Sequence, residues 1–366
     1  MSYYNILSEY KTIIPGPFSR ADIKNALASE HLTTEGFAAL LSPLAAEFLE
    51  PMAQRAHRTT LKYFGRTIQL YTPIYLSNYC DNRCLYCGFN ASNDFDRKRL
   101  TLDEVKREAE YIASTGLKHI LVLTGDSRKE SPVSYIKDCA EILKDHFTSI
   151  ALEVYALTGE EYAGLISSGV DGLTIYQETY DEALYATLHP SGPKSDFRFR
   201  LDAPERGAAA GMRNVNIGVL LGLNDWRSDV LFMALHARYL QDNYPEVEVA
   251  VSIPRIRPYA GDFKPSCAVS DADIVQIITA LRIFLPRSGI TVSTRENAKL
   301  RENIIPLGIT RMSAGSTTYV GGHTVKNAFE RDLAQFDISD KRSVEEIKAI
   351  LEGKDYQPVL KDWMRI

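Results

Sequence analysis

Membrane spans, a secretion signal and an excess of positive charge are all missing from this sequence. No apolar run among its 366 residues approaches the length that crosses a bilayer. Residues 1–10 have neither the basic nor the apolar region of a signal peptide, so none is expected. The formal net charge is −5, which provides no basic surface for nucleic acid or an anionic membrane. The remaining composition, 45% hydrophobic and 24% charged, is that of a globular protein large enough for one α/β barrel.

Cysteine is also scarce, and the chain has only five. An odd number argues against a disulfide framework and favours a reducing cytoplasm as the compartment. The seven histidines form no group with metal-ligand spacing, and we expect His119, His236 and His323 to be structural or at the surface. Cys139 and Cys267 lie outside any motif, whereas the other three cysteines share residues 80–87. That loop is therefore the most informative stretch of the chain.

The loop carries Cys80, Cys84 and Cys87 at CxxxCxxC spacing, with no fourth cysteine nearby. A closed zinc site takes four ligands, usually in two pairs, so three cysteines on one short loop fit it poorly. They suit a [4Fe-4S] cluster held by thiolates, with one iron left open to bind a small molecule. A colourless zinc-binding structural module and a fully ligated electron-transfer cluster or scaffold are the alternatives.

Strand and helix patterns alternate from about residue 68 onward. We expect strands at the apolar, β-branched runs 70–76, 119–123, 150–155, 172–176, 214–221, 248–254, 290–293 and 309–313. Helical patterns fall between them, for example at 102–115, 132–146, 199–210, 226–241, 270–284 and 296–304. Eight such strands predict an α/β fold and favour a closed (βα)8 TIM-type barrel, with a partial barrel as the alternative.

The pattern divides the chain into three segments. Residues 1–67 are expected to form an N-terminal helical cap, in which Ser19 caps one helix and Pro43 breaks another. Residues 68–324 are expected to form the barrel. Residues 325–366 are expected to form a polar C-terminal tail, packed on the barrel, with one amphipathic helix.

Polar residues gather where the predicted strands end, which is where active sites lie in such barrels. The residues expected at this mouth are Ser77, Asn78, Thr124, Asp126, Glu153, Tyr155, Gln177, Glu178, Asn216, Ser252, Arg255, Arg257, Thr294, Arg295, Glu296, Arg311 and Ser313. A charge inside an apolar strand is costly unless it is paired. Glu153 therefore indicates either a ligand-binding role or a salt bridge inside the barrel.

The cysteine loop resembles the signature of the radical S-adenosylmethionine (SAM) enzymes, because an aromatic residue, Tyr86, precedes the last cysteine. The resemblance implies that Cys80, Cys84 and Cys87 hold the cluster, while the amine and carboxylate of SAM bind its open iron. Reduction then splits SAM into methionine and a 5′-deoxyadenosyl radical.

A narrower resemblance extends over nearly the whole chain. It is carried by the stretches PIYLSNYCDNRCLYCGF, LTGD, LEVYAL, YQETY, RLDAPERGAAAG, STRE and QPVLKDW. Together they resemble the tyrosine lyases of thiamine biosynthesis, the 2-iminoacetate synthases, which are in the aromatic amino acid lyase group of radical SAM enzymes. The related tyrosine lyase of hydrogenase maturation carries a second cluster on C-terminal cysteines, and here no cysteine follows Cys267.

The resemblance assigns one set of residues to the amine and adenine of SAM. Tyr86 would lie near the adenine, as the aromatic residue of the motif does in relatives. Thr124, Gly125 and Asp126 match the segment whose polar groups meet the SAM amine. Relatives often have glutamate where Asp126 stands, and backbone carbonyls are the alternative contact.

Four further residues are assigned to the ribose, methionyl and carboxylate groups of SAM. Glu153 matches the acidic residue that faces the ribose, and Gln177 and Glu178 are candidates for the ribose or methionyl side. Arg200 matches an arginine that pairs with the SAM carboxylate, which a planar guanidinium binds in bidentate fashion. A surface arginine at a helix start is the alternative for Arg200.

Three residues are assigned by the resemblance to the amino acid substrate. Arg295 would hold the substrate carboxylate, and Ser313 would assist by hydrogen bonding. Tyr75 would face the substrate amine or the path of the radical. A core tyrosine with a satisfied hydroxyl and a serine that merely fills the barrel are the alternatives for Tyr75 and Ser313.

The implied reaction is cleavage of the Cα–Cβ bond of L-tyrosine to 2-iminoacetate (dehydroglycine) and p-cresol, for the thiazole of thiamine. The radical would take a hydrogen atom from the substrate amine. Because dehydroglycine hydrolyses easily, the resemblance also implies delivery to thiazole synthase, and it implies a one-electron donor of flavodoxin or ferredoxin type. The alternative within the same class is a radical lyase that acts on tryptophan or another aromatic amino acid.

Overall fold

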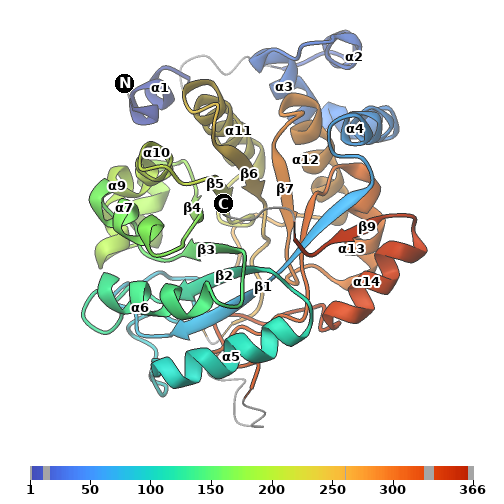
Figure 1. Cartoon of the computed structure of the whole chain (residues 1–366). Coiled ribbons are helices and arrows are strands. Elements are labelled where there is room, and N and C mark those ends of the chain that lie inside the picture. The colour runs from blue at the N-terminus through green and yellow to red at the C-terminus, as the bar shows by residue number, and fades with distance from the viewer. Residues whose placement is uncertain (1, 11–16, 260, 325–333, 362–366) are drawn as a thin grey trace.

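The computed structural model describes residues 2–10, 17–259, 261–324 and 334–361. Its centre is a ring of parallel strands (Figure 1). These strands are β1 (Thr67–Ser77), β2 (His119–Thr124), β3 (Ser149–Glu153), β4 (Gly172–Glu178), β5 (Asn214–Val219), β6 (Glu248–Ser252), β7 (Gly289–Val292) and β8 (Arg311–Ser313). Because β1 pairs with both β2 and β8, the ring is closed, and the prediction of a (βα)8 TIM-type barrel is confirmed.

Helices surround the ring, and each begins where the sequence supplies a capping side chain or a proline. The layer comprises α5 (Leu102–Ser114), α6 (Val133–Leu143), α7 (Gly159–Ser167), α8 (Glu182–Leu188), α9 (Phe197–Leu201), α10 (Ala203–Ala209), α11 (Trp226–Asn243), α12 (Asp271–Phe284) and α13 (Ala298–Ile304). Thr101, Thr158 and Ser270 start α5, α7 and α12 with reciprocal capping boxes. These local signals explain why the predicted helix starts at 102 and 270 lie within one residue of the observed starts at Leu102 and Asp271.

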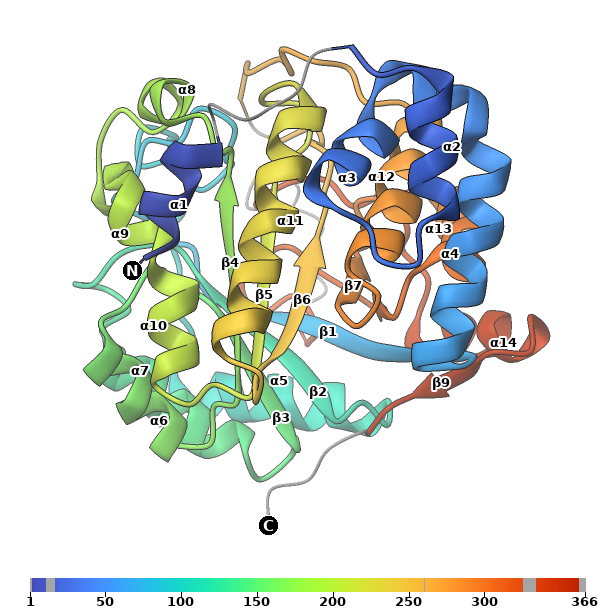
Figure 2. The ribbon, with the colours of Figure 1, turned by 90° about the horizontal axis from the view of Figure 1, so that it is seen from above.

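The described residues among the first 64 are mostly helical and pack on the outer layer of the barrel. They contain α1 (Tyr3–Tyr10), α2 (Arg20–Ala28), α3 (Thr34–Leu41), a 3-10 helix (Pro43–Phe48) and α4 (Leu49–Phe64). Ser19 caps α2 and Pro43 follows the end of α3, so both predictions are confirmed. Figure 2 shows α2, α3 and α4 beside α11 and α12, on the far side of these helices from the strands.

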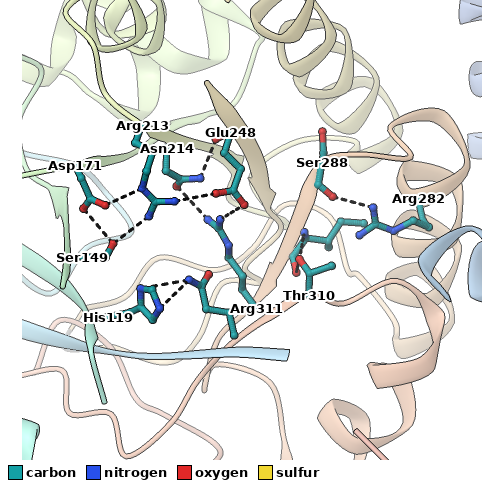
Figure 3. Close-up of polar contacts among 12 residues, drawn as sticks. His119, Ser149, Asp171, Arg213, Asn214, Glu248, Arg282, Ser288, Thr310 and Arg311 are labelled. Atoms are coloured by element: carbon teal, nitrogen blue, oxygen red, sulfur yellow. Dashed lines mark hydrogen bonds and ion pairs between the residues drawn. The ribbon is translucent and has the colours of Figure 1, made fainter. Parts of the chain in front are cut away.

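The amino ends of the strands are joined by a network of ion pairs (Figure 3). Arg213 contacts Asp171 at 2.9 Å and Glu248 at 3.3 Å, while Arg311 contacts Glu248 and the amide oxygen of Asn214. Arg311 is the first residue of β8, so the expectation that it lies at the barrel mouth was wrong. A cavity of about 520 Å³ lies among these side chains, but both guanidinium groups are already paired with carboxylates. This end of the barrel is therefore closed by a structural network.

The C-terminal part of the chain returns to the barrel at two places. Helix α14 (Val344–Gly353) and strand β9 (Gln357–Val359) lie at the start of β1, where β9 pairs with Thr67–Gln69 (Figure 2). Residues 334–340 lie at the opposite end, where the amides of Asp337 and Ser339 donate to the carbonyls of Pro258 and Thr294. In the parts of the chain that the structure describes, no helix is both long and apolar enough to cross a membrane.

Candidate active site

A cavity of about 740 Å³ opens at the carboxyl ends of the strands, a size suited to small ligands. Its wall brings together ten of the predicted site residues, which are Cys80, Cys84, Tyr86, Cys87, Thr124, Gly125, Asp126, Glu153, Glu178 and Arg295. An adjoining cavity of about 480 Å³ shares Glu153 and Arg295 with the first and adds Tyr75 and Ser313. Gln177 and Arg200 line neither cavity. The two cavities are therefore lined by most of the site residues that were predicted from the sequence.

The cysteine loop is held against the end of β2 by a close backbone approach at Gly125. A Cβ atom at this position would lie 2.3 Å from the carbonyl oxygen of Tyr79 and 3.1 Å from the Cβ of Cys80. The amide of Gly125 donates to Ser77 at 2.8 Å. The carboxylate of Asp126 accepts a hydrogen bond of 2.7 Å from Asn82, inside the loop. Gly125 and Asp126 thus position the loop, whatever else they contact.

Three thiols of one loop are the donor set that suits a cluster with one open iron. In the part of the chain that the structure describes, no group of three or more His, Cys, Asp or Glu side chains is arranged to hold a single metal ion. They line one cavity, and among its described lining residues there is no fourth cysteine. Burial raises the pKa of each thiol, that of Cys80 to about 12, so the free thiols are protonated and cluster binding must displace their protons. The hydroxyl of Thr124 lies in the same wall, buried and without a hydrogen-bond partner in the described residues. The donor set is thus three sulfurs beside a polar wall with unused hydrogen-bonding capacity.

Tyr86 is fixed by a hydrogen-bonded pair with His189. Its hydroxyl lies 2.6 Å from Nε2 of His189, and Nδ1 of the same ring lies 2.8 Å from the carbonyl oxygen of Tyr185. Burial lowers the pKa of His189 to about 2, so the ring is neutral. Since the carbonyl can only accept, Nδ1 carries the proton and Nε2 accepts from Tyr86. The ring of Tyr86 is therefore held rigidly at the cavity wall.

Glu178 is turned into the cavity by an irregularity at the end of β4. The pairing register of β4 with β5 shifts between Tyr176 and Glu178, and Glu178 has a φ of 71° in the left-handed region. Gln177 lies within this irregularity and donates instead to the carbonyl of Phe197 at 3.4 Å. The bulge therefore separates the two candidates, directing Glu178 towards the cavity and Gln177 towards α9.

Two cations flank Glu178. Lys194 donates to its carboxylate, and Arg200 lies 3.9 Å away while its Nε donates to the carbonyl of Tyr176. The three side chains are each about nine-tenths buried. Arg200 thus stands behind Glu178, where it neutralises buried charge instead of forming the cavity wall.

Arg295 and Glu153 share the wall between the two cavities. The guanidinium of Arg295 lies 3.4 Å from the ring centroid of Phe336, a stacked arrangement that fixes its plane. Arg295 is not among the arginines that form ion pairs in the described part of the chain. Burial raises the pKa of Glu153 to about 7, while the charge of Arg295 opposes this shift and that of Glu178 adds to it. The wall therefore contains a guanidinium, that of Arg295, with no carboxylate partner among the described residues, and a carboxyl, that of Glu153, that titrates near neutral pH.

The hydroxyls of Tyr75 and Ser313 both have partners. Tyr75 donates to the side-chain oxygen of Gln335 at 2.8 Å, and its ring packs edge-on against Phe89. The hydroxyl of Ser313 accepts from the amide of Thr294 at 3.0 Å. Ser313 therefore supports the turn that carries Arg295.

Several residues of this wall carry too little signal in the sequence to be found from it. Lys194, Gln335 and Phe336 line the cavity, but Lys194 comes from a short 3-10 helix (Pro193–Ser195) and the other two come from the segment after the barrel, outside any strand end. Arg257 was expected at the mouth but without a role, and its buried Nε has no partner in the described residues. Asn82 also lines the cavity, and its place between the first two cysteines was the one sign in the sequence that it lies near the site.

The family comparisons agree with this geometry. Residues 74–234 match the Radical SAM superfamily, and residues 252–357 match the Biotin and Thiamin Synthesis associated domain. The chain is 40% identical over 344 residues to the 2-iminoacetate synthase of Salmonella typhimurium, and equally to that of Escherichia coli. Each alignment covers 94% of this chain and 90% of the relative.

The chain belongs to the 2-iminoacetate synthase family of radical SAM enzymes. Its cofactors are accordingly a [4Fe-4S] cluster and SAM. Solved structures of the FeFe-hydrogenase maturase HydG resemble it closely. One is 34% identical with a TM-score of 0.86, covering 93% of this chain and 76% of that one. The HydG of Carboxydothermus hydrogenoformans is 30% identical with a TM-score of 0.87, and the match covers 98% of this chain and 83% of that one.

Proposed function

We propose that the two adjoining cavities are the place where this 2-iminoacetate synthase cleaves the Cα–Cβ bond of L-tyrosine. The products are 2-iminoacetate and p-cresol, for the thiazole of thiamine. The observation that carries the proposal is the meeting of three thiols, in one cavity wall, with an arginine that has no carboxylate partner among the described residues. Three sulfurs suit a cluster with an open iron, and a fixed guanidinium suits an amino acid carboxylate.

Cys80, Cys84 and Cys87 are the residues that would hold the cluster. When bound, the reduced cluster and SAM supply a radical that removes a hydrogen atom from the substrate. The protein holds SAM in place through the polar groups around the thiols. Thr124 offers an unused hydroxyl, Gly125 and Asp126 set the edge of the loop, and Tyr86 presents a rigid ring.

Two carboxyls and one arginine complete the SAM side of the proposal. Glu153 and Glu178 face the cavity and offer acceptors to ribose hydroxyls or to the SAM amine. Arg200 would act through Glu178, whose position it fixes from behind. Gln177 would act indirectly as well, by its bond to the segment at α9.

The substrate side is built around Arg295. Stacking on Phe336 holds the guanidinium in one plane before tyrosine arrives, so little order has to be gained on binding. Ser313 fixes the neighbouring amide of Thr294, and Tyr75 closes the adjoining cavity beside Glu153. Together these residues would orient the substrate amine towards the thiol side of the cavity and exclude water.

The wider setting follows from family membership and from the chemistry of the product. We infer a cytoplasmic, reducing compartment, a one-electron donor of flavodoxin or ferredoxin type, and direct transfer of the easily hydrolysed product to thiazole synthase. The proposed division of the chain is a cap at 1–67, a barrel at 68–324 and a tail at 325–366. The Biotin and Thiamin Synthesis domain, at 252–357, crosses the boundary between barrel and tail.

The test is an anaerobic assay of the reconstituted, reduced protein with SAM and one amino acid at a time. Formation of p-cresol and 5′-deoxyadenosine from tyrosine supports the proposal. Deoxyadenosine with an indole product from tryptophan, and no p-cresol from tyrosine, would favour the other aromatic substrate. An intact cluster that yields neither product would favour an electron-transfer or scaffold role.

A further inference from the structure

Gln335 is the residue through which the segment after the barrel reaches the cysteine loop. Its amide donates to the carbonyl of Thr318 at 2.9 Å, and its own carbonyl accepts from the amide of Gly88 at 3.2 Å. A Cβ atom on Gly88 would lie 2.6 Å from that carbonyl oxygen, so the glycine permits the contact. The backbone of Gln335 is thus fixed beside the residue that follows Cys87.

The side-chain amide of Gln335 lies between Tyr75 and Cys87. The hydroxyl of Tyr75 donates to Oε1 at 2.8 Å, and Nε2 lies 3.9 Å from Sγ of Cys87. Burial raises the pKa of Tyr75 well above its usual value, so the phenol keeps its proton and acts as a donor. An acceptor is therefore needed opposite Tyr75, and this requirement fixes the oxygen there and the NH₂ group towards sulfur.

The sulfur that Gln335 faces is anionic when the cluster is bound. Cys87 Sγ stands here for the thiolate that ligates iron. The side-chain N–H of Gln335, whose nitrogen lies 3.9 Å from this sulfur, is a donor that favours negative charge on it. Reduction places a further negative charge on the cluster, so the same donor favours the reduced state more than the oxidised one.

We propose that Gln335 is a positioning residue that links the cluster to the substrate side of the site. Its N–H donates to the Cys87 sulfur and raises the reduction potential of the cluster, while its oxygen holds the Tyr75 hydroxyl in the adjoining cavity. The inference rests on the proposed function, since it requires Cys87 to bind the cluster. It assigns a role in electron delivery to a residue 260 positions away from Tyr75 in the sequence.

The test measures the midpoint potential of the cluster by an anaerobic redox titration followed by electron paramagnetic resonance. Gln335→Met keeps the length of the side chain but removes both the N–H donor and the C=O acceptor of the side-chain amide. We expect a more negative potential, with the reduction equilibrium shifted between threefold and tenfold. A tenfold change corresponds to 59 mV for a one-electron couple. Gln54→Met, at an exposed position of α4, is the matched control and should leave the potential unchanged.

Tyr75→Phe separates the two halves of the inference. This variant removes the bond to the oxygen of Gln335 but keeps the N–H that faces sulfur. The reduction equilibrium constant of its cluster should therefore stay within threefold of the wild-type value. Gln335→Glu reverses the pattern, because the ionised carboxylate can accept from Tyr75 but has no proton to donate to sulfur. Its potential should fall, and this variant replaces Gln335→Met if the latter retains no cluster.

Each outcome decides the matter. A potential in Gln335→Met or Gln335→Glu equal to that of the wild type, at equal iron and sulfide content, would overturn the inference and leave Gln335 a packing residue. Cys87→Ala provides the independent check of the proposed function. If that variant keeps a normal cluster, Cys87 is not a cluster ligand, and the inference about Gln335 fails together with the proposed function. This failure is distinguished from that of the inference alone by the cluster content of Cys87→Ala.

Discussion

Single side chains in this site are held in place before any substrate is present, and Arg295 is the clearest case. Its guanidinium is stacked on Phe336, its backbone is supported through Thr294 by Ser313, and no ion pair in the described residues competes for it. Glu153 shares the same wall but is the opposite case, a carboxyl whose burial makes its charge costly. Both properties lead to measurable consequences.

Replacing Arg295 by Met should weaken tyrosine binding while leaving SAM binding intact. A charge-assisted hydrogen bond contributes about 1.5–3 kcal/mol, so kcat/KM for tyrosine should fall roughly 10- to 100-fold. Arg295→Lys should recover part of the loss, since it keeps the charge but not the planar fork. Arg287→Met, at an exposed position, is the control. Unchanged tyrosine affinity in Arg295→Met would remove the carboxylate role.

The raised pKa of Glu153 leads to a prediction of how the unfolding free energy of the cluster-free protein depends on pH. Burial raises its pKa from the usual 4.5 to about 7, so the folded protein retains a proton that the unfolded chain releases between these values. Its contribution to stability is fully present below pH 4.5 and is lost as the pH rises through 7. Glu153→Gln should therefore gain roughly 1–3 kcal/mol relative to the wild type between pH 5 and pH 8.

Urea unfolding at a series of pH values measures this difference. Glu345→Gln, at an exposed position of α14, controls for the change in overall charge. A stability difference between Glu153→Gln and the wild type that is the same at pH 5 and pH 8 would contradict the assignment.

At the scale of elements, the site depends on segments that approach each other without side chains between them. The end of β2 meets the cysteine loop at Gly125, and the segment 334–340 meets that loop at Gly88. Arg301, fully buried, pairs with Asp340 and donates to the carbonyl of Ser313, which ties this segment to β8. Burial alone would raise the pKa of Asp340, but hydrogen bonds from Arg342 and the charge of Arg301 hold it at about 2. The anchor is thus ionised throughout the neutral range.

Gly125→Ala should displace the cysteine loop, because its new Cβ would lie 2.3 Å from the carbonyl oxygen of Tyr79. We expect a substantial loss of bound iron and sulfide, and an unfolding free energy lower by about 1–3 kcal/mol. Gly164→Ala in α7 is the control, since nothing lies within 4 Å of its added Cβ. It should be neutral or slightly stabilising. Full cluster content in Gly125→Ala would show that the close approach is not required.

At the scale of the whole molecule, the sequence predicted what depends on local pattern. The eight apolar runs all became strands of the barrel, and the three cysteines lie where the first strand ends. Periodicity could not reveal that β4 bulges, which turns Glu178 inward and leaves Gln177 outside. Nor could it show that Arg311 opens its strand instead of ending it. A bulge of one residue changes the side of the strand that a side chain faces, and a shift of two residues along a strand changes the end of the barrel at which it lies.

Sequence periodicity and motifs could not predict the cavity-wall residues that come from segments distant in the sequence. Gln335 and Phe336 come from beyond the last strand of the barrel, and Lys194 comes from a short 3-10 helix that carries no motif. Gln335 and Phe336 are held by hydrogen bonds of their backbones to Thr318, and the amide of Lys194 donates to the side chain of Asn82 at 2.8 Å. These contacts join segments that are far apart in the sequence. Long-range contacts of this kind complete the site, and they need the folded structure to be seen.

The central claim is that three thiols of one loop hold a cluster with an iron open to SAM. It is tested most directly by the electron paramagnetic resonance spectrum of the reduced, reconstituted protein, recorded with and without SAM. We predict that SAM changes the spectrum of the wild type and of Cys267→Ala, whereas Cys84→Ala has no cluster signal and yields no 5′-deoxyadenosine. A normal cluster in Cys84→Ala, or a wild-type spectrum indifferent to SAM, would contradict the claim.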